Sequence, residues 1–534
     1  MEAVRPPLRV GIFVDSPRQP RWIVEALARA GAAGFAELTL VSEDRGRART
    51  SHGPGTRQAP VSVPLLWRAY AGADRAFSRG RRGGGKADVT RLVGVERRLN
   101  RADGCWRARI EAARLDVAFV LGDVDVAEIE HLARFGAWRY CFGEGHDSCE
   151  ALAGVREAIE DRQVVASGIR IHRPGHPDRV ACQSWSRSYL SVTRSRSALF
   201  AKMGEFVTRA LRELHAGGAR WIDLRTEPAG EAPPDRFPGT PGLIRGLTNL
   251  STRVVRRAAE KALKLETWSL AFRFGPDEDW SGSLDGFTRL DPPAGWFWAD
   301  PFPIERDGRF WIFFEELPHG AAKGHISVVE VGRDGTVSTP VKVLERPYHL
   351  SYPFLVEEGG ALFMIPETAD NRTVEVYRCV EFPARWELER VLLQDVSCAD
   401  ATLHREDGRW WMFANAAAPG AEMNDELHLF SSESLLGEWR PHRRNPVKSD
   451  VRSSRPAGRL FRRADGLYRP GQICTPLYGA GIALNRVTRL THDEYAEEET
   501  ARIEPKEART LGIHTFNRTG DLTVADAFER RPRF

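Results

Sequence analysis

Two aspartates in the second half of the chain open equivalent short segments and could together perform acid–base chemistry. Asp300 lies in the run Trp-Ala-Asp-Pro-Phe, and Asp400 lies in Cys-Ala-Asp-Ala-Thr. Two carboxylates across a sugar-sized cavity can act as acid, base or nucleophile. An aspartate at such a place can also cap a turn by accepting bonds from backbone N–H groups. Because the same residue type recurs at equivalent places, the pattern favours a shared pocket.

A third carboxylate and several hydrogen-bonding side chains are candidates for the same pocket. Glu367, in Ile-Pro-Glu-Thr, could donate a proton, or it could pair with an arginine such as Arg455. A guanidinium can hold an anionic group through two parallel bonds, although surface ion pairing explains the arginines nearly as well. A lone histidine is more often a hydrogen-bonded structural residue. The residues expected to bind the substrate are Arg455, Arg459, Tyr352, His514, Asn517 and Gln472.

The segments that carry these residues repeat at a spacing of roughly 50 residues, which is typical of a β-propeller. Each segment is a short apolar strand opened by a polar residue, then an acidic or glycine turn, then an aromatic strand. The four clear units begin at Ala299, Ser351, Ala399 and Ser454. We predict five blades, the fifth combining Gly512–Asn517 with Trp268–Phe274. Such closure removes exposed sheet edges, and the opening residue of each unit should face the central channel.

The first half of the chain alternates strand and helix patterns, which predicts a Rossmann-like parallel sheet. One helix is expected over Ala198–His215, where apolar residues form a single stripe. The strands are expected at Leu8–Asp15, Ala36–Val41 and Leu115–Leu121. The predicted organisation is a Rossmann-like domain over residues 1–225, a proline-rich linker with a basic helix over 226–266, and a propeller over 267–534.

Composition excludes several classes of partner and location. The 534 residues include 77 Lys and Arg against 73 Asp and Glu, so the net charge of +4 does not demand a nucleic-acid partner. No apolar run is long enough for a signal peptide or a membrane span. The seven cysteines form no Cys-x-x-Cys pair, which indicates reduced thiols in a cytoplasmic protein.

The basic amphipathic helix expected over Leu243–Leu265 has two interpretations. The favoured one is a helix between domains with a solvated basic face. The alternative is a peripheral contact with an anionic membrane, at the inner face of the bilayer.

Two features of the first half could serve a phosphate-bearing ligand. Asp123 and Asp125 form an Asp-x-Asp motif after a strand, where nucleotide-sugar transferases often hold a divalent metal. Two acids before a helix also suit capping, and this interpretation is favoured. The basic, glycine-rich stretches Arg45–Arg57 and Arg79–Lys86 are expected to be solvated loops, or loops that order on a phosphate. No resident cofactor is expected; a nucleotide sugar is the possible donor.

The repeated units resemble the five-bladed propeller glycosidases of the arabinanase and invertase type. The resemblance implies that Asp300 is the base or nucleophile and that Asp400 orients or tunes it. The acid of that family is a glutamate opening the fourth blade, but this chain has Ser-Arg-Pro there, with Arg455 in the middle. A permanently charged guanidinium cannot protonate a leaving group. Glu367 is the candidate that could replace the missing acid.

A closer resemblance connects the second half to the propeller domain of plant glucosamine inositolphosphorylceramide transferases and of their bacterial relatives. The segments that carry it are Tyr352–Phe354, Met364–Thr368, Ala399–Leu403, Asn445–Val447, Ser454–Arg459 and His514–Asn517. The plant enzymes also carry a glycosyltransferase domain for which this chain shows no counterpart. The resemblance therefore implies a role in glycan or glycolipid assembly without transferring the catalytic activity.

The first half resembles a diverged formyltransferase-like domain, through Val10–Asp15 and Ala133–Gly145. True formyltransferases use an Asn, His and Asp set, and no Asn-x-His pairing is present here. Glu144, His146 and Asp147 are polar and nearby but do not meet the pattern. Formyl transfer from a folate is therefore not expected, although a small-molecule cleft at the strand ends is.

These observations predict a carbohydrate-active enzyme, a transferase of cell-surface polysaccharide or glycolipid synthesis. Asp300 would act as base toward a hydroxyl of the acceptor and Asp400 would orient it. Arg455 and Arg459 would hold an anionic group of a sugar or lipid-linked substrate. One alternative is a propeller glycoside hydrolase whose acid is Glu367. Another is a catalytically silent glycan-binding partner of a glycosyltransferase.

Overall fold

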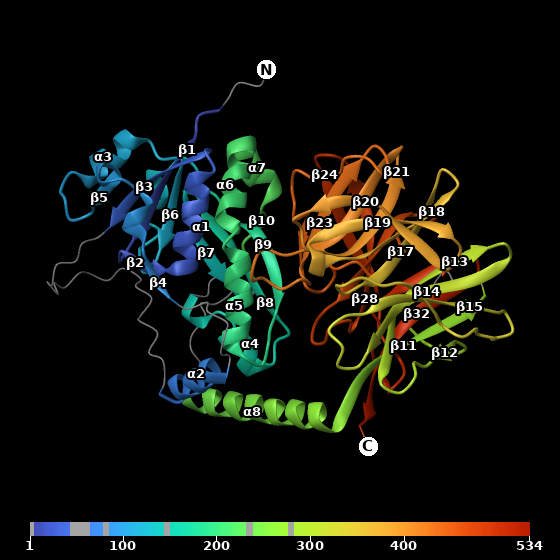
Figure 1. Ribbon diagram of the computed structural model, residues 1–534. Coiled ribbons are helices and arrows are strands. Elements are labelled where there is room, and N and C mark those ends of the chain that lie inside the picture. The colour runs from blue at the N-terminus through green and yellow to red at the C-terminus, as the bar shows by residue number, and fades with distance from the viewer. Residues whose placement is uncertain are drawn as a thin grey trace. The chain divides into compact units, whose positions relative to one another are not determined.

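The computed structural model describes residues 5–42, 65–77, 85–143, 150–230, 239–275 and 282–533. It divides into two compact units (Figure 1): residues 1–253 with 418–421, and residues 254–417 with 422–534. Several sequence features lie outside the described residues, and these are Arg45–Arg57, most of Arg79–Lys86, Glu144, His146, Asp147, Pro233, Pro234 and Pro238.

The first unit is built on an eight-stranded mixed sheet with the order β10-β9-β8-β7-β6-β1-β3-β5. From β7 to β5 the neighbouring strands are parallel, whereas β8, β9 and β10 are antiparallel additions. The predicted parallel strands are therefore present, but the antiparallel edge was not predicted. The strands are β1 (Leu8–Val14), β3 (Ala36–Ser42), β5 (Arg98–Asn100), β6 (Val117–Leu121), β7 (Ala137–Phe142), β8 (Val164–His172), β9 (Arg179–Arg187) and β10 (Glu227–Pro228), beside a small pair of β2 (Arg18–Pro20) and β4 (Lys86–Asp88).

Helices cover both faces of this sheet, which is why its central strands are apolar throughout. Val10, Ile12 and Val14 of β1 face a core shared with α1 and α6, while Phe13 faces a second core shared with α3. The helices are α1 (Arg21–Ala32), α2 (Leu65–Phe77), α3 (Trp106–Ala113), α4 (Val155–Glu160), α5 (Val192–Met203), α6 (Phe206–Gly217), α7 (Ala219–Arg225) and α8 (Thr240–Leu263).

The single helix predicted over Ala198–His215 is wrong in one respect: α5 ends at Met203 and α6 begins at Phe206. Gly204 lies at the break and its N–H closes the last turn of α5 on the carbonyl of Phe200. Glycine weakens a helix interior because its backbone is so free. The apolar stripe ran through the break because both helices bury residues in the same core.

The helix α8 is packed only along its first half. Leu243, Gly246 and Leu250 are buried, and a Cβ at Gly246 would clash with Ile159 of α4. Farther along, large apolar side chains are exposed, among them Val255 at 68%. The strand β11 begins at residue 264, so the helix ends before the predicted limit. Within the described residues, no helix combines the length and apolarity needed to cross a membrane.

The second unit is a five-bladed β-propeller, as predicted from the repeats. Four blades consist of consecutive antiparallel strands: β13–β16, β17–β20, β21–β24 with β25, and β26–β29. The strands of these blades are β13 (Trp296–Arg306), β14 (Arg309–Pro318), β15 (His325–Val331), β16 (Val341–Leu344), β17 (Ser351–Glu358), β18 (Ala361–Glu367), β19 (Thr373–Glu381), β20 (Arg385–Gln394), β21 (Cys398–Glu406), β22 (Arg409–Ala416), β23 (Glu426–Ser432), β24 (Arg440–Pro441), β25 (Lys448–Ser449), β26 (Phe461–Arg463), β27 (Gly466–Ile473), β28 (Gly481–Leu490) and β29 (Tyr495–Ile503).

The fifth blade is composite and closes the ring. It contains β11 (Lys264–Phe274), β12 (Thr288–Leu290), β30 (Thr510–Gly512), β31 (Phe516–Thr519) and β32 (Leu522–Pro532). The strands β11 and β32 pair antiparallel along their whole length, from Lys264 opposite Pro532 to Phe274 opposite Leu522. The predicted closure by strands from both ends of the propeller is therefore confirmed.

Candidate active site in the propeller

A β-bulge at the start of three inner strands sets the direction of the predicted site residues. In β13 the pairing with β14 shifts between Ala299 and Phe302, and the same shift occurs in β17 and β21. The residue at each bulge has a left-handed backbone: Asp300 (φ 54°), Tyr352 (φ 44°) and Asp400 (φ 54°). Residues other than glycine rarely adopt this backbone conformation, and a β-bulge changes the direction in which the side chain at the bulge points. The repeat in the sequence therefore produces the same bulge in three inner strands, and each bulge directs one side chain toward the centre of the ring.

Asp400, Arg455 and Glu367 form one connected group. The Arg455 Nε donates to Asp400 Oδ2 at 2.6 Å, and its terminal nitrogens donate to Asp400 Oδ1 at 3.2 Å and to Glu367 Oε2 at 3.3 Å. Arg455 also donates to the Met423 carbonyl and the Asn424 side chain. The Glu367 and Arg455 side chains are 15% and 13% exposed, so the group is partly open to solvent.

These contacts argue against the predicted grip of Arg455 on an anionic group, because its donors are already directed at protein acceptors. Arg459 is separate from the group. Its guanidinium lies over the rings of Phe302 and Phe354, and burial lowers its pKa to about 10. Within the part of the chain that the structure describes, its side chain forms no hydrogen bond or ion pair with Asp300, Asp400 or Glu367. Its place in the core between blades explains its burial without a ligand.

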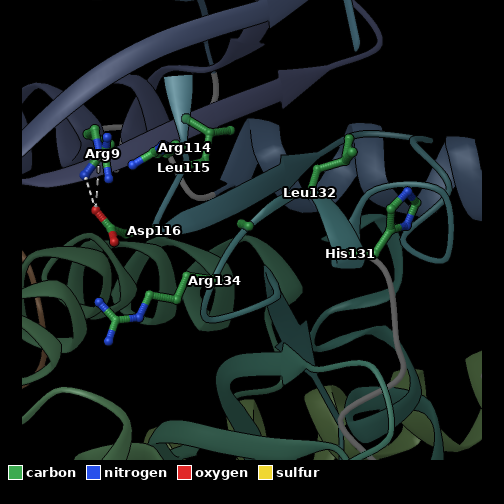
Figure 2. A pocket seen from close by; sticks show the side chains of 8 residues that line it. Arg9, Arg114, Leu115, Asp116, His131, Leu132 and Arg134 are labelled. Carbon is green, nitrogen blue, oxygen red and sulfur yellow. Dashed lines mark hydrogen bonds and ion pairs between the residues drawn. The ribbon is translucent and has the colours of Figure 1, made fainter. Parts of the chain in front are cut away.

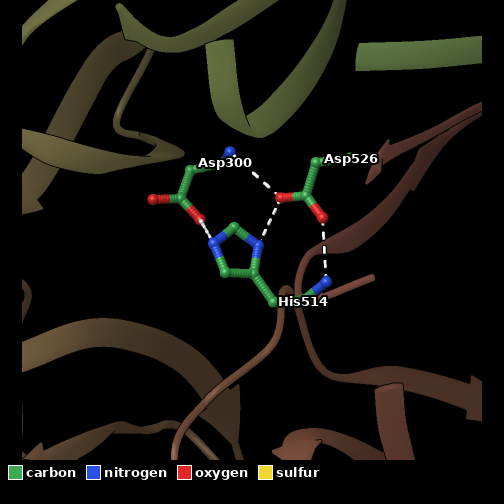
Figure 3. A group of neighbouring side chains, drawn as sticks. All are labelled: Asp300, His514 and Asp526. Atoms are coloured by element: carbon green, nitrogen blue, oxygen red, sulfur yellow. Dashed lines mark hydrogen bonds and ion pairs between the residues drawn. The ribbon is translucent and has the colours of Figure 1, made fainter. Parts of the chain in front are cut away.

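Asp300 is held by a second group that comes from the fifth blade. Thr515 Oγ1 donates to Asp300 Oδ1 at 2.7 Å, and the Tyr352 backbone N–H donates to Oδ2 at 3.2 Å. Figure 3 shows His514 between Asp300 and Asp526. The His514 Nδ1 lies 2.5 Å from Asp526 Oδ2, and its Nε2 lies 3.8 Å from Asp300 Oδ1.

Asp300, His514 and Asp526 are side chains of a type that can bind metals, and their polar atoms lie within 4.8 Å of one another. In the present arrangement these atoms are engaged with each other and with backbone N–H groups. Asp526 therefore links the group, because it accepts from the His514 ring and from the Asp300 N–H, while His514 Nε2 faces Asp300 across 3.8 Å.

Burial and mutual repulsion shift the ionisation of the clustered carboxyl groups. Burial, opposed by His514 and reinforced by Asp400 and Asp526, raises the pKa of Asp300 to about 6. Burial raises the pKa of Glu367 well above its usual value; Arg455 opposes the shift and Asp400 adds to it. Because the charge of Asp400 acts on both Asp300 and Glu367, these carboxyl groups lie near one another.

Glu315 belongs to the same cluster and was not predicted. Burial, with repulsion from Asp300, Glu367 and Asp400, raises its pKa well above the usual value. A signal was present: Glu315 and Glu367 each stand fifteen residues after the opening residue of their unit, Asp300 and Tyr352. The register makes them equivalent, because each pairs with the residue immediately before the bulge.

Three predicted substrate-binding residues have structural contacts. The Tyr352 hydroxyl accepts from the Gly458 N–H at 2.8 Å and bonds Thr402 at 2.8 Å. The Asn517 side chain donates to the Pro301 carbonyl at 2.9 Å and accepts from the Arg459 N–H at 2.8 Å. Gln472 donates to Asp400 Oδ2 at 2.9 Å. All three side chains are buried, so Tyr352 and Asn517 join blades and Gln472 orients Asp400.

Two aromatic residues near the cluster were also not predicted. The Trp268 ring stacks on His514 with centroids 3.9 Å apart and planes 18° apart. The Tyr478 ring meets His514 edge-on at 5.4 Å, and the Arg455 guanidinium lies 5.1 Å from its centroid. Trp268 belongs to the strand that starts the propeller, so only ring closure brings it here.

The first unit contains a separate pocket of about 370 Å³ at the amino ends of β1 and β6. Figure 2 shows Arg9 and Arg114 near Asp116, with Arg134 on another side. The predicted cleft lay at the opposite, carboxyl ends of the strands. At those ends, Asp125 Oδ1 accepts from the Ala127 N–H at 3.0 Å, which is a local turn contact. Among the described residues, Asp123 and Asp125 belong to no group of three metal-binding side chains.

Comparison with known proteins connects the propeller to one family. Residues 291–524 match the family model described as glucosamine inositolphosphorylceramide transferase 1, N-terminal. The chain is 36% identical over 205 residues to the glucosamine inositolphosphorylceramide transferase 1 of Oryza sativa subsp. japonica. It is 33% identical over 216 residues to that of Arabidopsis thaliana. These matches cover 38% and 40% of this chain but only 27% and 28% of the plant proteins.

Solved structures with a similar fold include two glycoside hydrolases. A family 117 glycoside hydrolase from Zobellia galactanivorans has a TM-score of 0.33 and 13% identity, covering 50% of this chain and 90% of that protein. The α-L-arabinofuranosidase of Lactobacillus brevis has a TM-score of 0.32 and 13% identity, covering 42% and 86%. At these values neither likeness carries an argument about the chemistry of this chain.

Proposed function

We propose that the propeller is the catalytic part of a carbohydrate-active enzyme, a transferase in the assembly of glycolipids or cell-surface polysaccharides. The observation that carries the proposal is Asp300: it is buried, its pKa is raised to about 6, and it faces Asp400 and His514. A group with such a pKa is ionised at neutral pH and remains basic enough to accept a proton. The plant relatives named as transferases support the reaction class.

In the proposed reaction Asp300 takes the proton of an acceptor hydroxyl. The hydroxyl oxygen then forms a bond to the anomeric carbon of a nucleotide sugar, and the bond from that carbon to the diphosphate breaks. Asp400, fixed by Arg455 and Gln472, presents its carboxyl group to the forming oxocarbenium-like centre. The acceptor is a sugar or a glycolipid.

Glycoside hydrolysis is the second candidate, and the state of Glu367 favours it. Burial and the neighbouring Asp400 raise the pKa of this carboxyl, which favours the protonated form that can donate a proton to a leaving group. Its side chain is partly exposed, as a group that meets substrate must be. In this reaction Asp300 would activate a water molecule or attack the sugar directly.

The substitution Asp300→Asn tests the proposal, with Asp307→Asn as the matched control. Asp307 also has a left-handed backbone, in the exposed turn between β13 and β14. We expect Asp300→Asn to lower transfer from nucleotide sugars at least a hundredfold, while Asp307→Asn leaves it unchanged. Release of free sugar from an oligosaccharide without a nucleotide donor would favour hydrolysis. Glycan binding without turnover by any donor would favour a binding module and overturn both.

We further propose that α8 contacts an anionic membrane surface from the cytoplasmic side. The exposed Val255 and Leu263 lie among basic residues such as Arg256 and Lys261. Apolar insertion combined with attraction to anionic lipid is the physics of such contacts. Co-sedimentation with anionic vesicles should fall much further for Val255→Glu than for Thr252→Glu, because both add the same charge but only the first removes an apolar side chain. Two statements stay predictions: that the first unit is similar to formyltransferases, and that the chain is related to bacterial proteins.

A further inference from the structure

The blade that closes the ring brings a histidine and a buried aspartate to Asp300 (Figure 3). His514 precedes β31, and Asp526 lies on β32. The contact of 2.5 Å between His514 Nδ1 and Asp526 Oδ2 requires a proton on Nδ1, because the carboxylate can only accept. The other ring nitrogen, Nε2, is therefore the one that faces Asp300.

Asp526 is fixed as an acceptor on both of its oxygens. The backbone N–H groups of His514 and Thr515 donate to Oδ1 at 2.8 and 3.1 Å, and the N–H of Asp300 donates to Oδ2 at 3.2 Å. The side chain is fully buried. An aspartate held in this way cannot rotate away from the imidazole, so the tautomer of His514 is determined by the backbone.

The imidazole ring is fixed as well. The Trp268 ring stacks on one face at 3.9 Å, and Tyr478 meets the ring edge-on. Gly479 has a left-handed backbone (φ 67°), and a Cβ there would lie 2.7 Å from the His514 Cβ and 2.8 Å from Trp268. The close approach leaves the ring no room to turn.

We propose that Asp526 and His514 are positioning residues that set the ionisation of Asp300, so that ring closure itself assembles the working base. The catalytic consequence rests on the proposed function, whereas the ionisation does not. Burial opposes a charge on His514, but the carboxylates of Asp526, Asp300 and Asp400 raise its pKa. The resulting imidazolium favours the ionised form of Asp300.

Other charged groups also lie near Asp300 and His514, and each has a defined direction of effect on the ionisation of the cluster. Asp400 and Asp526 repel the charge on Asp300, and the charge on Asp300 in turn raises the pKa of Glu315. The ionisation of Asp300 is thus a balance in which a cation at His514 opposes burial and two negative neighbours, Asp400 and Asp526. The remaining groups of the cluster are Arg455, Glu367 and Tyr478, which also interact with Asp400.

The titration of His514 in the full chain tests the proposal directly. In protein with ¹⁵N-labelled histidine rings, assigned by loss of the signal in His514→Gln, we expect the pKa of His514 to exceed 6.5, the ordinary value. In Asp526→Asn it should fall below 6.5, because burial is no longer opposed. An unchanged titration in Asp526→Asn, or a neutral ring from pH 5 to 8 in the unmodified protein, overturns the proposal.

A second measurement keeps the proposal open to test if Asp526→Asn does not fold. In His514→Gln the acid limb of kcat/KM should move upward from about pH 6, giving at least a tenfold loss at pH 6 that is recovered at pH 8. A merely structural role would lower activity equally at both pH values, and that result overturns the proposal. The control is His492→Gln, an exposed histidine beside Asp493.

The two proposals fail separately. If no sugar is turned over, the titration of His514 still decides the present one. If turnover depends on Asp300 but His514 titrates independently of Asp526, the proposed function stands and only the positioning role is lost.

Discussion

Glu315 in the first blade and Glu367 in the second occupy the same place in their sheets. Glu315 pairs with Ala299 and Glu367 pairs with Ser351, in each case the residue just before the left-handed bulge. In the third blade the same place holds Asn415. Burial raises the pKa of both glutamates well above their usual value. The cluster therefore contains two glutamates that hold their protons to a higher pH than usual, although the fourth blade opens with an arginine.

The raised pKa of Glu367 predicts that its substitution affects sugar transfer and glycoside hydrolysis differently. Glu367→Gln should leave transfer from a nucleotide sugar within about tenfold of the unmodified rate, because a diphosphate leaves without a proton. The same substitution should lower hydrolysis of an unactivated oligosaccharide by 10²-fold or more, the usual contribution of a general acid. Steady-state rates with both substrates check this, and Glu305→Gln, at an exposed place on β13, is the control. A hundredfold loss with the nucleotide sugar would contradict it.

The raised pKa of Asp300 predicts a pH-dependent stability. A carboxyl group whose pKa is higher in the folded than in the unfolded state stabilises at low pH, and this contribution is lost as pH rises through the folded value. Here the window runs from about 4 to about 6. The difference corresponds to roughly 3 kcal/mol of unfolding free energy. Urea unfolding should show the unmodified protein losing stability relative to Asp300→Asn across this window. Parallel pH curves would exclude the raised pKa.

Replacing Arg455 should destabilise the propeller most at neutral and higher pH. Arg455→Gln leaves Asp400 and Glu367 without their cation, and breaking a buried ion pair typically costs about 3–5 kcal/mol. Protonation of Glu367 relieves the repulsion, so the loss should shrink as pH falls toward 5. Thermal unfolding of Arg455→Gln at pH 5 and pH 8 measures the difference.

A surface arginine provides the comparison for that experiment. Arg309→Gln removes an exposed ion pair with Glu330, which should cost less than about 1 kcal/mol at either pH. Equal losses for both variants would show that Arg455 is not engaged as its contacts indicate.

The hydroxyl of Tyr352 should matter for stability and little for substrate affinity. Tyr352→Phe leaves the Gly458 N–H without its acceptor in a buried place, which costs about 1–3 kcal/mol. We expect a lower midpoint of thermal unfolding and an unchanged KM. Tyr468→Phe, whose hydroxyl bonds Asp465, is the control. A rise in KM without loss of stability would restore the substrate-binding role predicted from the sequence.

Removal of β32 should prevent the propeller from closing. A chain ending at Asp521 lacks the strand that pairs with β11, β30 and β31, and it also lacks Asp526. The unpaired β11 would expose a ladder edge, which promotes aggregation. Circular dichroism should show loss of the cooperative transition of the propeller, whereas removing residues 533–534 alone should have no effect. A cooperative transition in the chain ending at Asp521 would show that closure is dispensable.

The architecture of the propeller could be predicted because it follows from local patterns that repeat along the sequence. Strand alternation and turn residues recur in each unit, so the blades and the composite fifth blade were predictable without any long-range contact. The same repeat identified Asp300 and Asp400, since equivalent positions in a ring face the same centre. In the first unit the parallel strands were predictable for a similar reason, but the antiparallel β8 to β10 were not, because their alternation does not reveal their partners.

Ionisation and partnership were decided by the tertiary structure alone. Arg455 donates a hydrogen bond to Asp400, 55 positions earlier, and Asp300 accepts one from Thr515, 215 positions later. Burial determines which carboxyl groups keep their protons, and burial is a property of packed neighbours. The sequence by itself therefore determined which residues could meet at the centre of the ring. Only the closed ring decided which of them are buried, which carboxyl groups have raised pKa values and which side chains hold the blades together, because these properties depend on desolvation and on contacts between distant strands.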